Sequence, residues 1–228
     1  LNASDISSSE QFESAVRDYI YSVTSRQAKG GRGQQHRVTR LCAKDPSTLV
    51  HMAYLRRLFP RAKFIYMVRD VRAAVYSYMR YQAPYELLNR LFMTDVYLRE
   101  WNALNREVKS ACDAVGPATC LLVRYETLVL QFNRTMQRIC RHLDLPWTDD
   151  FFRHEQFVEE NDDGRVRVAA TEWSTAQIRR ALYSDSLSAW RDHIAYEPAK
   201  LDTLAGMYKE LGYNLTATTY DYLSRLLD

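Results

Sequence analysis

The sequence has no long apolar run, and nothing in its 228 residues approaches the roughly 20 consecutive apolar residues of a membrane-spanning helix. It has no large excess of one charge either. The formal net charge is only +3 and is dispersed, which argues against nucleic acid as a partner. Histidine, cysteine and acidic residues do not cluster at metal-ligand spacing, so no metal site is predicted. The remaining composition, 46% hydrophobic and 26% charged, predicts a single globular domain over residues 1–228.

The most informative segment present runs from Phe59 to Ser77. Branched and aromatic residues at Lys63–Val68 predict a buried strand, and helical spacing follows it, with Asp70 as the N-cap. Ligands of open α/β sheets bind at the carboxyl ends of strands, where Arg69 offers a five-donor fork suited to phosphate. Ser77, two helical turns later, adds a hydroxyl on the same side. Taken alone, the segment also fits a plain strand–helix junction with Arg69 in a structural ion pair.

Strands and helices alternate along the rest of the chain, which predicts an α/β fold with a mainly parallel sheet. Ser7 and Glu10 form a capping-box pattern at the start of the first helix, and Gly212 is placed to end the last one. Residues 27–37 contain three glycines and are interpreted as a flexible surface loop. The predicted strands are 40–43, 63–68 and 119–124, and the predicted helices are 7–26, 45–58, 71–79, 85–114, 135–143, 148–160 and 198–211.

Four separated blocks of the chain resemble protein-tyrosine sulfotransferases, the Golgi enzymes that sulfate tyrosines of secretory proteins. The blocks are Arg40–Pro46 (RLCAKDP), Phe59–Ser77, Leu121–Glu126 (LLVRYE) and Trp173–Gln177 (WSTAQ), and the resemblance runs from about Arg37 to Tyr213. It implies a sulfotransferase-like fold of three layers, related to the P-loop NTPases. It also implies 3′-phosphoadenosine-5′-phosphosulfate as the sulfate donor, with no metal.

The resemblance assigns roles to particular residues. Lys44 and Ser174 are the predicted catalytic pair, because charge that builds on the leaving group must be neutralised by fixed donors. Ser174 is equally well placed as a plain helix N-cap, and the two roles are compatible. Without the motifs, Lys44 is an ordinary turn lysine and Tyr125 a packing aromatic. The predicted donor-binding residues are Arg69, Ser77, Tyr125, Ser174, Thr175 and Gln177.

The cysteines and sequons favour the secretory pathway. Cys112 and Cys120 flank a Gly-Pro turn whose reversal can bring their sulfur atoms within bonding reach, and the family has a disulfide at the matching pair. Cys42 matches a family cysteine whose partner lies upstream of Leu1, and Cys140 is predicted to be a buried free thiol. Three Asn-Xaa-Ser/Thr sequons begin at Asn2, Asn133 and Asn214.

Several departures from the family pattern affect the expected donor affinity. Val71 stands where the family has glycine, Tyr81 where it has arginine (with Arg80 adjacent), and Ala189 where it has lysine. The family's phosphosulfate-binding loop and glutamate base are expected before Leu1, so the chain is interpreted as an amino-terminally truncated fragment that is inactive alone. A membrane anchor, as in a type II protein of the Golgi lumen, is also expected upstream.

The sequence thus predicts sulfate transfer to tyrosines in acidic segments of secretory proteins by the full-length enzyme. The family forms homodimers, so a homodimer is compatible with the resemblance. A carbohydrate sulfotransferase is the enzymatic alternative, because it shares the strand–Arg–helix segment. A catalytically dead nucleotide-binding or interaction domain is the alternative from another class, and the changes at Tyr81 and Ala189, together with the loop expected upstream, keep it open.

Overall fold

The computed structural model describes residues 3–28, 40–44, 48–82, 87–158, 177, 179–191, 196–217 and 219–226. The chain divides into two compact units. Unit 1 consists of Leu1–Ala62 and Thr148–Ala181, and unit 2 of Lys63–Trp147 and Leu182–Asp228. One domain over residues 1–228 stays a prediction.

Unit 2 is built on two parallel strands, β1 (Phe64–Val68) and β2 (Cys120–Arg124). Their register runs from Phe64 opposite Cys120 to Val68 opposite Arg124, so both strands end at the same level. Tyr66, Val68 and Val123 are buried, as expected for strands rich in branched and aromatic residues. The two predicted strands and their parallel pairing are therefore confirmed.

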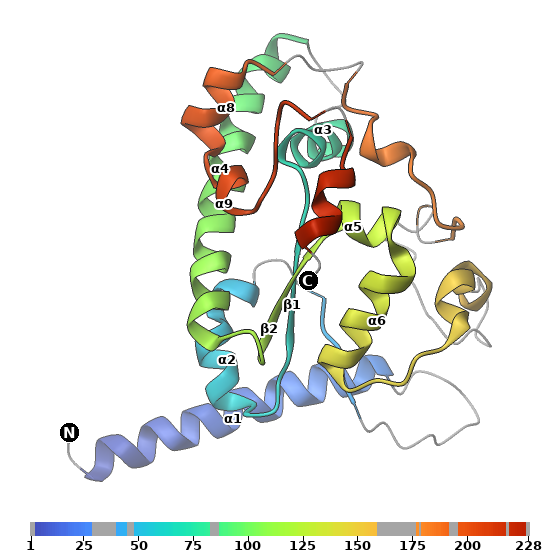
Figure 1. The fold of residues 1–228 in the computed structure, drawn as a ribbon. Helices are drawn as coiled ribbons and strands as arrows, with labels where there is room; N and C mark the ends of the chain where they lie inside the picture. The colour runs from blue at the N-terminus through green and yellow to red at the C-terminus, as the bar shows by residue number, and fades with distance from the viewer. Residues whose placement is uncertain are drawn as a thin grey trace. The chain divides into compact units, whose positions relative to one another are not determined.

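Helices cover both faces of this strand pair and give unit 2 three layers (Figure 1). The long helix α4 packs against both strands, and α6 contacts β2 from the other side. These helices match the prediction with small shifts of their ends, whereas the short α5 directly after β2 was not predicted. The bounds are α3 Val71–Gln82, α4 Leu87–Val115, α5 Tyr125–Leu130 and α6 Phe132–Leu143.

The last predicted helix, over residues 198–211, is divided in two: α8 (Pro198–Ala205) and α9 (Met207–Glu210). The division falls at Gly206, where the backbone N–H of Met207 donates to Oδ1 of Asn102 on α4 at 2.9 Å. A side chain of a neighbouring helix thus replaces a bond of the helix ladder. Gly212 ends the second piece with a φ of 80°, which confirms its predicted role. Short 3₁₀ turns complete the unit at η3 (Asp185–Leu187) and η4 (Asp221–Leu226).

Unit 1 contains helix α1 (Ala3–Ala28), turn η1 (Thr48–His51), helix α2 (Met52–Leu58) and turn η2 (Asp149–Phe157). An ion pair between Arg57 and Glu13 joins α2 to α1. None of the helices in the described part of the chain is long and apolar enough to cross a membrane.

Several predictions for unit 1 were wrong in detail. Helix α1 begins at Ala3, so Ser7 lies inside it and does not cap it. The helix also continues to Ala28, two residues into the predicted loop 27–37, and residues 29–37 lie outside the described ones. Residues 40–43 are not a strand, because a strand requires a hydrogen-bonded partner and the one sheet of the described residues pairs β1 with β2 alone. The predicted helix over 148–160 is a 3₁₀ segment with a kink at Arg153.

The predicted disulfide between Cys112 and Cys120 is present and closes the turn between α4 and β2. The Cα atoms of the two cysteines are 5.3 Å apart. Gly116 lies between them with a φ of 81°, and its carbonyl accepts from the backbone N–H groups of Thr119 and Cys120. Cys140 is buried with a free thiol, as predicted, and Cys42 is free and exposed.

Removal of this disulfide is expected to destabilise the chain without changing its fold. For so short a loop, the unfolded-state entropy predicts that a Cys112→Ala/Cys120→Ala variant loses about 2.5 kcal/mol of unfolding free energy. In a chain of this size the corresponding fall in Tm is about 5 to 10 °C. Thermal unfolding followed by circular dichroism measures it, with Cys42→Ser as a control that should keep the wild-type Tm. Equal Tm values for the double variant and the wild type would contradict the expectation.

Candidate functional site

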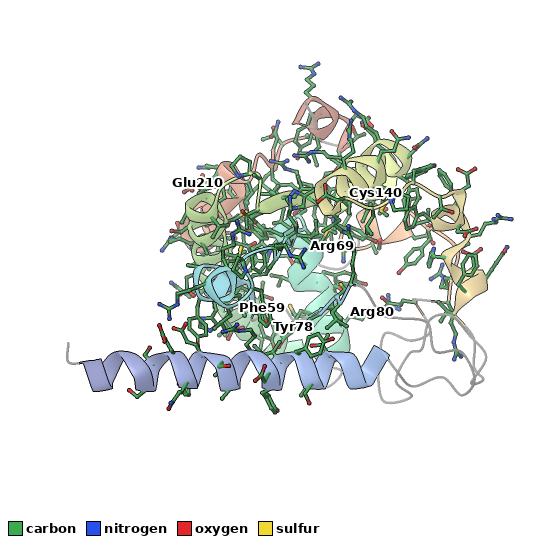
Figure 2. The ribbon with its side chains drawn as sticks, turned by 90° about the horizontal axis from the view of Figure 1, so that it is seen from below. Phe59, Arg69, Tyr78, Arg80, Cys140 and Glu210 are labelled. Atoms are coloured by element: carbon green, nitrogen blue, oxygen red, sulfur yellow. A yellow bond between two sulfur atoms is a disulfide. The ribbon has the colours of Figure 1, made fainter. Side chains whose placement is uncertain are left out.

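The candidate site lies where β1 and β2 end together, at the carboxyl edge of the strand pair. Arg69 directly follows β1, and Tyr125 directly follows β2. Asp70 then caps helix α3, because its Oδ1 accepts from the backbone N–H of Arg72 at 2.8 Å. The predicted N-cap is thus confirmed. Because Arg69 lies between the end of β1 and the capped first turn of α3, its backbone position is fixed. Figure 2 shows Arg69 between the α4 and α6 sides of the unit.

The structure brings the side chains of Arg69 and Tyr125 into contact. The guanidinium carbon of Arg69 lies 4.7 Å from the centroid of the Tyr125 ring, which is a cation–π distance. Its Nη2 donates to the backbone carbonyl of Ser186 at 2.6 Å. The Tyr125 and Ser186 hydroxyl oxygens are 2.7 Å apart and share a hydrogen bond. Three side chains from distant parts of the sequence therefore meet at one point.

Within the described part of the chain, one donor of this cluster has no acceptor. The Nε of Arg69 is buried, and it has no hydrogen-bond partner among the described residues. Buried polar groups in proteins are nearly always hydrogen-bonded, so this guanidinium N–H indicates a place for an acceptor outside the described residues. An anion such as a phosphate group has the matching charge and geometry. The residues present thus fit the phosphate of the predicted donor.

Ser186 was not found by the sequence analysis. It belongs to η3, and 117 positions separate it from the guanidinium that it holds. Its surroundings match no motif, and a lone serine in a polar segment carries no signal of a binding role. Only the return of the chain after residue 182 to unit 2 brings it to the strand ends.

The structure shows less of the other predicted site residues, some of which lie outside the described residues. Ser77 is half-buried on α3, which begins at Val71 and puts it two turns from Arg69. Lys44 is exposed in the irregular segment 40–44 of unit 1. Gln177, also in unit 1, is half-buried, whereas Ser174 and Thr175 lie outside the described residues. The structure therefore joins Arg69 to Tyr125, and the roles of all these residues stay predictions.

A buried polar network lies directly behind the cluster. Asp70 is fully buried, and its carboxylate accepts from Nε and Nη2 of Arg72 at 3.1 and 2.7 Å and from the Tyr220 hydroxyl at 3.0 Å. The Arg72 guanidinium also stacks on the Trp190 ring at 4.2 Å. Burial alone would lower the pKa of Arg72, but the hydrogen bonds and charge of Asp70 outweigh it and raise that pKa.

The family departures occupy definite places in this frame. Val71 is fully buried as the first residue of α3, so a helix has begun where the family has glycine. Tyr81 lies in the last turn of that helix, beside the exposed Arg80. Ala189 precedes Trp190, and the guanidinium of Arg191 lies 5.7 Å from the Trp190 ring. The positive charge of Arg191 is thus held at the indole.

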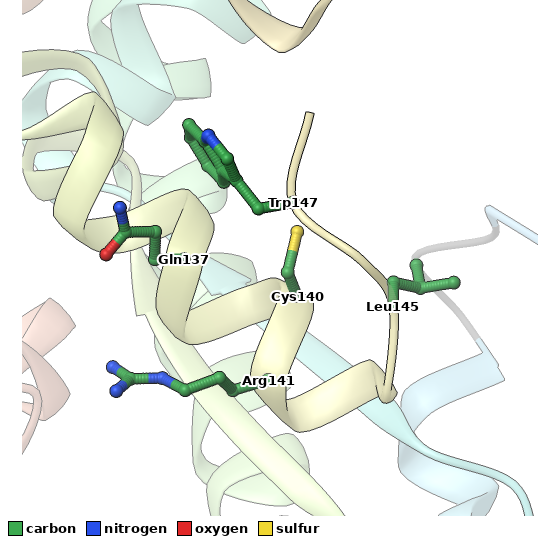
Figure 3. Close-up of a pocket in the computed structure, with 5 residues that line it drawn as sticks. All are labelled: Gln137, Cys140, Arg141, Leu145 and Trp147. Carbon is green, nitrogen blue, oxygen red and sulfur yellow. The ribbon is translucent and has the colours of Figure 1, made fainter. Parts of the chain in front are cut away.

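A separate hollow lies beside α6 and shares no residue with the Arg69 cluster. Figure 3 shows its lining, in which Cys140 points from α6 toward the segment that carries Leu145 and Trp147. Burial raises the pKa of the Cys140 thiol and disfavours the reactive thiolate. The remaining lining residues are Gln137 and Arg141.

Comparison with known proteins identifies the class to which this chain belongs. A sequence profile described as "Sulfotransferase family" matches residues 2–149. Because the match covers more than half of the chain, the chain belongs to the sulfotransferase family.

Within this family the similar proteins are protein-tyrosine sulfotransferases. Protein-tyrosine sulfotransferase A of Caenorhabditis elegans is 35% identical over 83% of this chain and 49% of its own length. Protein-tyrosine sulfotransferase 2 of Gallus gallus is 34% identical over 80% of this chain and 48% of its own length. A putative protein-tyrosine sulfotransferase of Caenorhabditis elegans is 30% identical over 93% of this chain and 78% of its length. The chain thus spans about half the length of the first two relatives.

Solved structures agree on the fold. The sulfotransferase domain of the olefin synthase from Synechococcus PCC 7002 superposes with a TM-score of 0.61 at 23% identity, over 88% of this chain and 65% of that one. The sulfotransferase domain from the curacin biosynthetic pathway superposes with a TM-score of 0.58 at 17% identity, over 78% of this chain and 64% of that one. The predicted α/β sulfotransferase fold is therefore confirmed.

Proposed function

We propose that the whole protein transfers sulfate from 3′-phosphoadenosine-5′-phosphosulfate to tyrosine residues of other proteins. The observation that carries the proposal is the buried Nε of Arg69, which lies beside Tyr125 at the carboxyl edge of the parallel strands and has no hydrogen-bond partner among the described residues. That edge is where α/β folds bind nucleotides. The similar protein-tyrosine sulfotransferases support the choice of acceptor.

Each predicted residue has a task in this reaction. Arg69, Ser77 and Tyr125 are assigned to the nucleotide end of the donor, and Ser174, Thr175 and Gln177 are the further proposed donor-binding residues. The bound donor supplies an activated sulfuryl group, and the phenol oxygen of the substrate must approach it in line with the leaving oxygen. Lys44 and Ser174 stabilise the charge that develops on that leaving oxygen. The phenol has a pKa of about 10, so the reaction at neutral pH also needs a positioned base.

Nucleotide binding by the chain tests the donor assignment. Isothermal calorimetry with 3′-phosphoadenosine 5′-phosphate should give an affinity at least about tenfold higher than with adenosine 5′-phosphate, because only the first ligand carries the phosphate that pairs with Arg69. Equal affinities for the two nucleotides, or no binding of either, would remove the proposed donor site.

The acceptor is the second part of the proposal. We infer that the substrates are tyrosines in acidic segments of secretory proteins, and that a homodimer carries out the reaction. Incubation of the whole protein with radiolabelled donor, an acidic tyrosine peptide and an oligosaccharide compares the candidate acceptors. Label on the oligosaccharide alone would favour a carbohydrate sulfotransferase, and label on neither would favour the nucleotide-binding or interaction domain.

We also propose that the protein works in the Golgi lumen. The Cys112–Cys120 disulfide supports an oxidising compartment, where such bonds persist. The sequons support it as well, although they differ in their surroundings. Asn133 lies within α6, where Thr135 of the same sequon is fully buried and its hydroxyl bonds to the carbonyl of Thr127. The sequon at Asn2 begins outside the described residues.

Asn214 is expected to carry an N-linked glycan when the protein is made in a secretory pathway. The side chain is exposed, and its Oδ1 accepts from both the backbone N–H and the hydroxyl of Thr216, at 2.9 and 2.7 Å. The asparagine and the hydroxyl of this sequon are thus together on the surface. Digestion with an amidase that removes N-glycans should lower the mass of the wild-type and Asn133→Gln proteins. The Asn214→Gln protein should lack the glycopeptide that contains position 214. If the wild-type protein also lacked this glycopeptide, the expectation would be contradicted.

A further inference from the structure

We propose that Glu126 is a positioning residue that holds Arg69 and Tyr125 in the geometry needed to bind the donor. The inference rests on the proposed function, because it concerns how the same site is held in place. Glu126 follows Tyr125 in α5 and is only 1% exposed, so it does not itself reach a ligand in solvent. Its action is on the backbone that carries the two binding side chains.

The first observation is a link between the two strand ends. Oε1 of Glu126 accepts from the backbone N–H of Asp70 at 2.9 Å. The last paired residues of the sheet are Val68 and Arg124. Arg69 and Tyr125 therefore lie between the end of the backbone ladder and this side-chain link. The strand pairing on one side and the Glu126–Asp70 hydrogen bond on the other fix the backbone of Arg69 and Tyr125. Without the second bond the strand ends would be free to diverge.

The second observation is that the carboxylate is itself fixed. Oε2 of Glu126 accepts from the Tyr213 hydroxyl at 2.7 Å, and the same hydroxyl lies 3.4 Å from the carbonyl oxygen of Val68. Each oxygen of the carboxylate thus accepts a hydrogen bond, which suits a group that only accepts hydrogen bonds. Tyr213 thus fixes the carboxylate of Glu126, and this carboxylate in turn fixes the backbone N–H of Asp70.

The third observation concerns the other side of the link. Asp70, whose N–H is bound by Glu126, uses its carboxylate to hold Arg72 and Tyr220. A shift of the Asp70 backbone would therefore disturb a buried ion pair and the cap of α3. Burial raises the pKa of Glu126, and hydrogen bonds from Tyr213 and Asp70 oppose this rise. Burial of a carboxylate costs free energy, so an apolar side chain would fill the same space at a lower cost. The carboxylate, unlike an apolar side chain, can fix a backbone N–H.

Three variants of the chain separate positioning from a general contribution to stability. In Glu126→Gln, Oε1 still accepts from Asp70, and Nε2 donates to the Tyr213 oxygen once that hydroxyl turns toward Val68. Glu126→Asp is one methylene shorter and does not reach the Asp70 N–H. Tyr213→Phe is the matched control, because it removes a bond to Glu126 and destabilises the core but leaves the link to Asp70 intact.

The measurements are the Kd for 3′-phosphoadenosine 5′-phosphate by calorimetry and the Tm of each variant. All binding is measured at a temperature at which every variant is folded. We expect a Kd within about threefold of wild type for Glu126→Gln and Tyr213→Phe, and a Kd about tenfold higher for Glu126→Asp, as for the loss of one fixed contact. The Tm of Glu126→Asp and of Tyr213→Phe should both fall.

Two results would overturn the inference. One is an unchanged Kd for Glu126→Asp, and the other is a Kd that rises in Tyr213→Phe as much as in Glu126→Asp, so that affinity merely follows stability. A wild-type chain that binds no nucleotide is a different result, because it overturns the proposed donor site. If Glu126→Asp does not fold, Glu126→Gln decides the matter. Its Kd must then stay near that of the wild type, and a tenfold rise would refute positioning by the hydrogen bond to Asp70.

Discussion

Replacement of Lys44 by alanine in the whole protein is expected to lower kcat by about 100-fold or more, while the Kd for the donor changes by less than about threefold. The physical reason is that the positive charge of Lys44 acts mainly in the transition state. Negative charge gathers on the leaving oxygen only as the bond to sulfur breaks, so a compact ammonium placed there stabilises the transition state more than the bound donor. The exposure of Lys44 in the irregular segment 40–44 leaves its ammonium group available to a ligand.

The measurement pairs steady-state kinetics of sulfate transfer with calorimetry of donor binding. Lys109→Ala is a suitable control, because Lys109 forms an ion pair with Asp113 on the surface of α4, and this variant should match the wild type in both quantities. A Lys44→Ala variant that loses affinity and keeps its turnover would show that Lys44 anchors the bound donor. Its predicted catalytic role would then be wrong.

Arg69→Ala is expected to raise the Kd for 3′-phosphoadenosine 5′-phosphate by about 10- to 100-fold, the range for a lost hydrogen bond between charged groups. The same variant should bind adenosine 5′-phosphate almost as the wild type does, because that ligand has no 3′-phosphate to lose. The difference between the two ligands isolates the contact with phosphate from any disturbance of Tyr125 or Ser186.

Two further variants sharpen the test of Arg69. Arg69→Lys keeps the charge but lacks the planar fork, so its Kd should lie between those of Arg69→Ala and the wild type. Arg61→Ala removes an exposed arginine from the turn before β1 and should leave the Kd unchanged. If Arg69→Ala weakened both nucleotides equally, Arg69 would have a structural role and the 3′-phosphate would be held elsewhere.

The sequence was sufficient to predict the two strands that Arg69 and Tyr125 follow, for a simple reason. The segments 63–68 and 119–124 are dense in branched and aromatic residues, and two parallel strands must end at the same edge. Arg69 and Tyr125 follow those strands directly, so their approach to one another is a consequence of strand pairing. The capping of α3 by Asp70 was likewise visible in the order of residue types.

The parts that were not predicted depend on contacts between distant residues. The carbonyl of Ser186 accepts from Arg69, and Asn102 divides the last helix by binding the N–H of Met207. No local spacing encodes either contact. The strand expected at residues 40–43 shows the same limit, because an apolar run becomes a strand only when a partner offers hydrogen bonds. Glu126 belonged to a recognised block, but its burial beneath Asp70 required the folded chain to be seen.

The dependence of the strand ends on the carboxyl-terminal segment has a consequence for biosynthesis. Ribosomes deliver the strands, Arg69 and Tyr125 well before Ser186, Tyr213 and Tyr220 emerge. Until then the carboxylates of Asp70 and Glu126 lack their tyrosine donors, and desolvating them is unfavourable. A nascent chain that still lacks these residues should therefore keep its two strand ends hydrated and without fixed positions. It should not yet bind the nucleotide. Emergence of the segment that carries Ser186, Tyr213 and Tyr220 becomes the event that allows the site to form.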